Sequence, residues 1–370
     1  MKKALVAAAL MAAGVVTAHA QSSVTLYGRL DAGLEYMSGL ANGTGGSTSR
    51  FRAESGDWGT SLWGMKGTED IGSGNKVLFK LEGSFNTMTG AGPGGGGLFN
   101  RWATVGLSND RYGTLLLGRM LFISNGVWDF DPFGQSNWSS ASLVRGRNWP
   151  QSSNNISYQS PSFNGFDVYG QYALSNATSW NGNGTTPQGR EAGLQLTYTN
   201  SLFQVRGIYD EIRNSGNGQF TSPFSASREY TAAANVFLGA FKISAAYQAI
   251  RTSHAASVSG TAPTSLDHEW GGVTWQATPA AALIAAVYHV NANKGGGNAT
   301  IYSVGGTYNL SKRTLLDIQV ATVRNSKNAN FGLEANDAGA GGPTSTGGFN
   351  DNPMPGHSQS GVYAGIQHLF

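Results

Sequence analysis

Cysteine is absent from this chain of 370 residues. Small exported domains often depend on disulfides for their stability, and this chain cannot form any. The absence also excludes a thiol nucleophile and a thiolate metal site. If the protein is exported, another extensive bonding network must hold it together.

Charged residues are scarce, at 12% of the chain. The 24 basic residues include Lys2 and Lys3, which lie in a segment that we expect to be removed, so 22 basic residues remain against 21 acidic ones, a net charge of +1. A nucleic-acid partner would require basic residues gathered on one face. We expect no nucleic-acid partner.

Long apolar runs are also missing. The run Ala4–Val16 covers about 13 residues, too few to cross roughly 30 Å of hydrocarbon as a helix. It follows the cationic stretch Met1–Lys3 and precedes Ala18 and Ala20, the small residues that frame a cleavage site. We therefore predict a signal peptide at 1–20 and a single domain over 21–370.

That domain shows no linker, no shift in composition and no long amphipathic helix, whereas glycine is abundant with 53 residues. A large soluble all-β protein and a membrane-spanning β-barrel both fit such a composition. The alternation of side chains decides between them.

The segment Ser23–Tyr36 alternates strictly. Its even positions are apolar or small, namely Val24, Leu26, Gly28, Leu30, Ala32, Leu34 and Tyr36, and its odd positions include Arg29, Asp31 and Glu35. Side chains point to opposite faces along a strand, so one face is apolar and the other polar. Strands of soluble proteins usually run about 5–6 residues, but tilted barrel strands need about 9–11. The length therefore favours a membrane barrel.

Similar alternation recurs along the chain, over 76–85, 236–243, 315–322 and 362–370. The segment 283–290 is less clear because both of its faces are apolar, and we interpret it as a segment that faces a neighbouring subunit. Outward residues such as Gly28, Ala32 and Leu116 also suit a subunit interface.

Turn signals divide the chain into two kinds of connection. Seven short ones lie at 72–75, 109–113, 162–165, 200–201, 239–240, 277–279 and 309–313. Eight long ones, rich in Gly, Ser and Asn, lie near 38–58, 88–99, 120–150, 176–188, 213–226, 252–267, 293–297 and 326–357. Fifteen connections join about sixteen strands. Short turns at one end and long loops at the other are typical of an antiparallel transmembrane β-barrel, whose closure leaves no sheet edge.

Several short stretches carry a resemblance when they are taken in order. They are Ser23–Gly28, Gly64–Asp70, Val105–Ser108, Leu117–Arg119, Tyr308–Thr314 and Gly365–Phe370. With them the chain resembles the general Gram-negative outer-membrane porins, most closely the betaproteobacterial branch, over the whole of 21–370.

The resemblance implies a function and a set of partners. It implies a homotrimer in the outer membrane, in contact with outer-membrane lipid, that lets ions and small hydrophilic solutes diffuse passively through a water-filled channel. It implies short periplasmic turns, long extracellular loops and a third loop folded into the barrel. It also implies that the terminal aromatic residue, Phe370, is recognised by the barrel assembly machinery.

In such channels, acidic residues of the third loop face basic residues of the wall. Asp129 and Asp131 in the segment 120–150 fit the acidic pattern and are expected to set a transverse field across the pore. We predict that these two aspartates determine the cation share of the current.

Basic candidates come from two sources. Strand parity places Arg29 and Lys80 on a polar face, the resemblance adds Lys66 and Arg101, and Arg119 is a candidate because it ends the strand before the loop. The chain departs from the family at Leu62 and Gln151, where arginine is common. We expect Arg145 and Arg147 to compensate.

Three other functions are possible for a barrel of this kind: a substrate-specific channel, an enzyme, and a structural or adhesive protein. A substrate-specific channel for sugars or small organic acids would use the loop aromatics Trp128, Phe130, Phe133 and Trp138. A barrel enzyme would need a nucleophile and a base at the rim, and no such constellation is visible. A purely structural or adhesive barrel would not conduct. No metal-ligand or cofactor motif stands out, and we expect neither a metal nor a cofactor.

Overall fold

The structure is a computed structural model that describes residues 23–42, 45–92, 97–175, 188–253, 263–334 and 351–370. The segment 1–20, expected to be a signal peptide, lies outside these residues. Within the described ranges, no helix is both long enough and apolar enough to cross a membrane.

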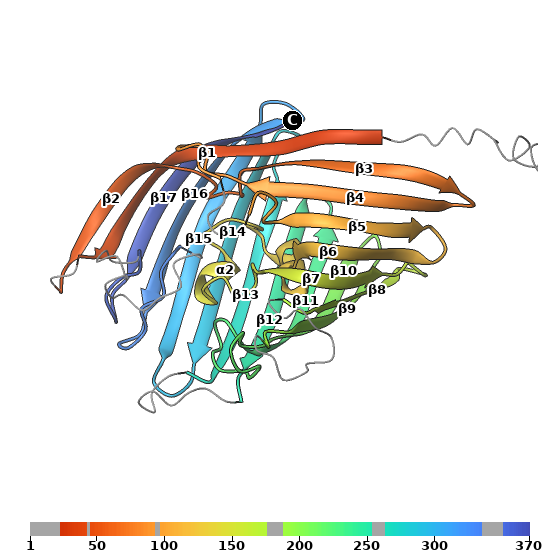
Figure 1. Ribbon diagram of the computed structural model, residues 1–370. Helices are drawn as coiled ribbons and strands as arrows, with labels where there is room; N and C mark the ends of the chain where they lie inside the picture. Colours follow the sequence, from red (N-terminus) through yellow and green to blue (C-terminus); the bar gives the residue numbers. More distant parts are fainter. Residues whose placement is uncertain (1–22, 43–44, 93–96, 176–187, 254–262, 335–350) are drawn as a thin grey trace, which may run out of the picture.

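Strands make up most of the described residues (Figure 1). They are β1 (Ser23–Ala41), β2 (Ser47–Glu54), β3 (Leu62–Gly72), β4 (Asn75–Ser84), β5 (Trp102–Asn109), β6 (Gly113–Leu121), β7 (Gln151–Gln159), β8 (Phe166–Ala173), β9 (Glu191–Thr199), β10 (Phe203–Ile212), β11 (Arg228–Leu238), β12 (Phe241–Arg251), β13 (Ser265–Gln276), β14 (Ala281–Ala292), β15 (Gly297–Asn309), β16 (Thr314–Asn325) and β17 (Gln359–Leu369). Two short helices, η1 (Ile123–Phe130) and α2 (Ser140–Leu143), lie between β6 and β7.

The sheet closes on itself through β1. Sequential strands pair antiparallel, and β17 pairs with β1 from Arg29↔Leu369 to Ser38↔Ser360. Strand β1 also pairs with β3 over its first part and with β2 over its second part. Strands β2 and β3 are thus one barrel strand interrupted at 55–61, and the wall is the predicted closed barrel of 16 strands.

The predicted short turns agree with the structure, one predicted long connection does not, and much of the long connections near 88–99, 176–188, 252–267 and 326–357 lies outside the described residues. All seven short turns join the strand pairs where they were expected, from β3–β4 to β15–β16. The long connection predicted at 38–58 is wrong, because it contains the end of β1 and the whole of β2. The sequence of β2 is polar and was therefore predicted to be a loop. Its arginines Arg50 and Arg52 belong to a strand, where they form ion pairs with Glu35 of β1.

Exposure along the strands confirms the alternation. On β1, Val24, Leu26, Leu34 and Tyr36 are exposed, while Asp31 and Glu35 are buried on the opposite face. The apolar face is therefore the outside of the barrel and the polar face lines the inside. Leu116 was expected outside and is not, because its neighbours Leu115 and Leu117 are the exposed residues of β6.

Candidate channel constriction

The long connection 122–150, here called loop 3, lies inside the barrel. Its helix η1 contacts the inner faces of β9–β12, and α2 contacts β14 (Figure 1). The predicted infolding of the third loop is confirmed. Because loop 3 covers one side of the wall, the open part of the lumen lies between the loop and the strands β3–β7.

Glycines on the inner wall let loop 3 approach closely. A Cβ atom at Gly361 of β17 would lie 2.6 Å from the ring of Trp138. One at Gly272 of β13 would lie 2.6 Å from Cγ of Pro132. No real side chain fits at these distances, so the loop rests on the bare backbone of the wall.

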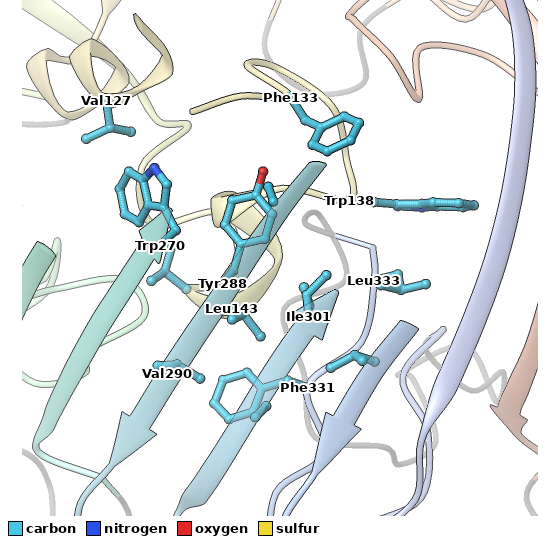
Figure 2. Close-up of a cluster of buried hydrophobic side chains, with 14 of the residues drawn as sticks. Val127, Phe133, Trp138, Leu143, Trp270, Tyr288, Val290, Ile301, Phe331 and Leu333 are labelled. Carbon is cyan, nitrogen blue, oxygen red and sulfur yellow. The ribbon is translucent and has the colours of Figure 1, made fainter. Parts of the chain in front are cut away.

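Apolar side chains pack between loop 3 and the inner face of the wall. Figure 2 shows Phe133, Trp138 and Leu143 of loop 3 together with Tyr288, Val290 and Ile301 of the strands and with Phe331 and Leu333 of the connection that follows β16. This cluster explains the two apolar faces of β14. Ile284, Ala286, Tyr288 and Val290 point inward and are buried in this cluster, so loop 3 and its neighbours account for one of the two apolar faces of 283–290.

Asp131 anchors the loop rather than lining the open channel. The residue is only 3% exposed. One carboxylate oxygen accepts hydrogen bonds from the Tyr288 hydroxyl at 2.6 Å and from the Phe133 backbone N–H at 2.9 Å, and the other accepts from the Ser140 N–H at 2.9 Å. Burial raises the pKa of Asp131, and these hydrogen bonds oppose the rise. This position differs from the one that the sequence pattern led us to expect.

Asp129, by contrast, keeps 60% of its side chain exposed. Its Oδ2 atom lies 2.6 Å from Nη1 of Arg206, and its backbone carbonyl accepts a hydrogen bond from Nζ of Lys242 at 2.8 Å. Arg206 and Lys242 were missed in the sequence. Their inward parity on β10 and β12 is the signal that could have identified them.

Basic residues occupy the wall opposite the loop. Glu82 of β4 lies 2.8 Å from Nε of Arg101 and 3.3 Å from Nζ of Lys80, and it accepts a hydrogen bond from the Tyr27 hydroxyl. Lys66 is exposed and lies 5.3 Å from the centre of the Tyr27 ring. Two of the predicted basic residues, Lys80 and Arg101, are thus brought together around one carboxylate, and Lys66 lies over the Tyr27 ring.

Arg29 and Arg119 contact other parts of the site. Arg29 donates to the Thr60 carbonyl and, at 2.8 Å, to Oε1 of Gln135 on loop 3, so it joins the wall to the loop. Arg119 follows a bulge in β6 and donates to the Asn100 carbonyl and to Oγ of Ser153. It therefore ties neighbouring wall segments together.

Arg145 and Arg147 have different surroundings. Arg145 stacks on Phe224 and Phe331 and donates to Oδ1 of Asn330 at 3.0 Å, and burial lowers its pKa to about 10, so it is charged at neutral pH. Its φ of +50° is unusual for a residue with a side chain.

Arg147 is fully buried and lies 2.6 Å from Asp210 and 3.9 Å from Glu229 of the wall. Burial opposes its charge, but these carboxylates prevail and raise its pKa. Arg147 therefore anchors the end of loop 3 instead of lining the open lumen, which differs from the sequence expectation.

A polar cavity of about 330 Å³ lies between loop 3 and the wall. Its lining residues are Thr60, Ser84, Asn100, Arg101, Trp128, Gln135, Arg145, Gly146, Trp149, Pro150 and Gln151. Among these described residues, two are arginines and none is acidic. Gln151 occupies a position where the family resemblance would place arginine, and Arg145 supplies a guanidinium to the same cavity.

One cluster of carboxylates in the described part of the chain is a candidate cation site. Glu35, Asp57 and Glu334 offer carboxylate oxygens within 4.8 Å of one another. However, Arg52 lies 2.9 Å from Glu35 and 3.6 Å from Glu334. The guanidinium thus already neutralises part of this cluster, which argues against a metal ion there.

Phe370 completes the closure of the barrel. Its N–H donates to the Gly28 carbonyl at 3.1 Å, and its carbonyl accepts from the Gly28 N–H at 3.0 Å. A Cβ at Gly28 would lie 2.3 Å from the Phe370 ring, so the ring lies directly over this glycine.

Comparisons with known proteins agree with this architecture. The family model for Gram-negative porins matches residues 4–329. An outer membrane porin protein of Bordetella pertussis is 32% identical over 266 residues, which cover 67% of this chain and 69% of the relative. Outer membrane porin protein 32 of Delftia acidovorans is 30% identical over 383 residues and covers 100% of both chains.

Solved structures agree as well. The anion-selective porin from Comamonas acidovorans has a TM-score of 0.76 at 25% identity, and the match covers 94% of this chain and 100% of that chain. The outer-membrane expressed OmpT of Vibrio cholerae has a TM-score of 0.64 at 13% identity, which is a likeness of fold. The closed barrel, the infolded loop 3 and the match along most of the sequence lead to one conclusion: the chain belongs to the Gram-negative porin family of outer-membrane channels.

Proposed function

We propose that this porin is a general-diffusion channel that favours small anions over cations. The observation that carries the proposal is the cavity between loop 3 and the wall, where Arg101 and Arg145 are the charged lining residues. A low-dielectric wall around narrow water strengthens the field of such charges. Small anions should therefore concentrate at the narrowest part of the channel.

The charges around the cavity support this preference. Lys80 and Arg101 both pair with a single carboxylate, Glu82, and Lys66 lies with Lys80 over the Tyr27 ring. Across the lumen, the exposed carboxylate of Asp129 is neutralised by Arg206. The relative from Comamonas acidovorans is itself described as anion-selective.

Planar-bilayer conductance tests the general-diffusion part of the proposal. A water-filled channel should conduct in proportion to salt concentration and should not saturate with any one solute. Conductance that saturates with a particular sugar or organic acid would instead favour a substrate-specific channel, and no conductance at all would favour a structural barrel. As a channel without a catalytic constellation among its described residues, the protein should also leave lipid and peptide substrates unchanged.

The biological assembly is part of the proposal. We infer a homotrimer, because the outward residues Gly28 and Ala32 on β1 are small and the chain resembles trimeric porins. Unboiled protein should migrate as a trimer on a denaturing gel, and monomer-sized migration in mild detergent would count against it.

Export and insertion complete the proposal. Residues 1–20 act as a signal peptide and 21–370 form the barrel, which the assembly machinery inserts by way of Phe370. The intact mass of the outer-membrane protein should correspond to a chain that starts at Gln21. Retention of residues 1–20 would contradict this step.

A further inference from the structure

Arg145 differs from the paired arginines of the site because it has no acidic partner. Arg101 lies 2.8 Å from Glu82, and Arg147 lies 2.6 Å from Asp210. Among the described residues, no carboxylate forms an ion pair with Arg145, and burial alone lowers its pKa. A carboxylate beside a guanidinium cancels much of its field at longer distance. Arg145 therefore acts on a passing ion with its full charge.

Three neutral groups hold this guanidinium in place. Its central carbon lies 4.4 Å from the centre of the Phe224 ring and 5.1 Å from the centre of the Phe331 ring. The two rings are themselves in contact, with their centres 6.1 Å apart. Nη2 of Arg145 also donates to Oδ1 of Asn330 at 3.0 Å. An aromatic face attracts a cation through its quadrupole but carries no net charge. The guanidinium is thus held without being neutralised.

The two rings come from two other extracellular connections. Phe224 lies between β10 and β11, whereas Asn330 and Phe331 follow β16. Phe331 is 2% exposed and belongs to the buried cluster of Figure 2. Its N–H donates to Oδ1 of Asn325 at 2.9 Å, and its carbonyl accepts from Nδ2 of Asn325 at 2.9 Å. Because Asn325 ends β16, the barrel wall itself fixes the position of this ring.

The backbone of Arg145 gives a second reason why these contacts matter. Its φ of +50° lies in the left-handed region, and Gly146 follows with a φ of +78° or less, at +73°. A residue with a Cβ atom keeps such a conformation only where its surroundings enforce it. A long arginine side chain also has many rotamers, and fixing one of them costs conformational entropy. Without the ring contacts, the guanidinium would therefore spend less time at its observed position.

The observed position is the one that matters for the channel. Arg145 lines the cavity between loop 3 and the wall, and neither Phe224 nor Phe331 is among the lining residues. The two rings therefore do not meet a permeating ion themselves. Any effect that they have on ion preference must pass through the guanidinium that they hold.

We propose that Phe224 and Phe331 are positioning residues for ion selectivity, which hold the unpaired guanidinium of Arg145 at the channel cavity. Two extracellular connections outside the cavity, those that follow β10 and β16, thereby set the strength of the anion preference. The inference rests on the proposed anion preference and adds the residues that maintain it.

Reversal potentials of the full-length trimer in planar bilayers test the proposal through a mutant cycle. R145Q should lower the permeability ratio of chloride to potassium by about fivefold, the effect of one charge about 4 Å away in bulk water. F224L/F331L, which keeps apolar bulk and removes both rings, should lower it by about twofold, because the charge remains but is no longer held. Adding F224L/F331L to R145Q should cause no further change. The matched control F51L removes a ring that is 69% exposed on the outer face of β2, and it should match the wild type.

A pair of single variants covers the case in which the loss of buried Phe331 prevents folding, which trimer migration would report. Phe224 is only partly buried, so F224L should fold. F224L should lower the ratio by about 1.5-fold, whereas F224W keeps an aromatic face and should retain the wild-type ratio. A merely structural role for the ring would not give this rescue.

The results that would overturn the proposal differ from those that would overturn the anion preference. A lower ratio in R145Q with a wild-type ratio in F224L/F331L, or in F224L if only the single variant folds, would contradict the positioning role alone. An equally large further fall when F224L/F331L is added to R145Q would do so too, because the rings would then act without Arg145. An unchanged ratio in R145Q itself would contradict the role of Arg145 in the proposed function, and the positioning role with it.

Discussion

At the scale of single residues, the two aspartates of loop 3 have separate roles. Asp129 is exposed and pairs with Arg206, whereas Asp131 is buried among hydrogen-bond donors. The sequence identified both as acidic residues of the constriction. It could not separate them, because a loop without a repeating pattern gives no information on which side chain points inward.

Exchanging each aspartate for asparagine distinguishes these roles. D129N removes an exposed negative charge and should shift the permeability ratio toward anions by roughly twofold, the effect of one charge about 10 Å away in water. D131N should leave the ratio nearly unchanged and should destabilise the barrel by about 1.5–3 kcal/mol, because its amide nitrogen cannot accept the Ser140 hydrogen bond. Reversal potentials and urea unfolding measure the two effects, and equal shifts in reversal potential would refute the distinction.

Glu334 gives the protein a pH-dependent stability. Burial, together with the charges of Asp57 and Glu35, raises the pKa of Glu334 well above its ordinary value. A carboxyl group with a raised pKa in the folded state stabilises the fold fully below its unfolded pKa, and this stability is lost as the pH rises through the folded pKa. The contribution of Glu334 should therefore be greater at pH 4 than at pH 8.

The variant E334Q tests this assignment, because a neutral amide imitates the protonated acid. E334Q should raise the temperature at which the trimer dissociates by a few degrees at pH 8. At pH 4 it should change this temperature little. E269Q, which alters an exposed carboxylate on the outer face, serves as the control. A loss of stability at both pH values would show instead that the charge of Glu334 is needed by Arg52.

At the scale of elements, the position of loop 3 depends on the wall as much as on the loop. Strand β14 carries apolar residues on both faces because loop 3 covers its inner one. The sequence revealed the strand but not its second partner, since an apolar face looks the same whether a loop or a subunit covers it. The sequence did not reveal strand β2 either. Its inward arginines are polar like loop residues, and the sequence does not show that they are paired within the barrel.

Adding a side chain at Gly361 tests this packing. The atoms nearest to a Cβ there belong to the Trp138 ring, so G361V should push loop 3 away from the wall and toward the lumen. Such overpacking typically costs about 1–3 kcal/mol. We expect a lower single-channel conductance at an unchanged reversal potential. A364V, on the exposed outer face of the same strand, should conduct like the wild type. Equal conductance in both variants would contradict the packing of loop 3 on this wall.

At the scale of the whole molecule, the alternation of side chains and the spacing of the turns predicted the number of strands and the closure of the barrel. Side chains alternate between the two faces with a period of two residues along every strand, and this period can be seen in the sequence. The constriction was only partly predictable. Lys80 and Arg101 do meet at Glu82, and Lys66 lies over the Tyr27 ring, but Arg206 and Lys242 come from strands distant in sequence from the loop that they contact. Their role depends on how loop 3 crosses the lumen.

Phe370 lies at the seam that closes the molecule. The variant F370A keeps the backbone bonds to Gly28 and removes the ring that covers this glycine. We expect less barrel in the outer membrane and an unchanged conductance per inserted channel, because the ring lies on the outer face, away from the lumen. Quantitative immunoblotting with bilayer recording checks both, and a normal amount of inserted F370A would rule out the assembly role.

The reversal potential of the wild-type trimer under a tenfold potassium chloride gradient tests the central claim most directly. Because Arg101 and Arg145 line the cavity and no described lining residue is acidic, the potential should have the sign of a chloride-selective channel. R145Q should move it toward zero, while R111Q at a periplasmic turn should leave it in place. The preference should weaken at 1 M salt, where the screening length falls to about 3 Å. A wild-type potential of zero or of the potassium-selective sign would contradict the account.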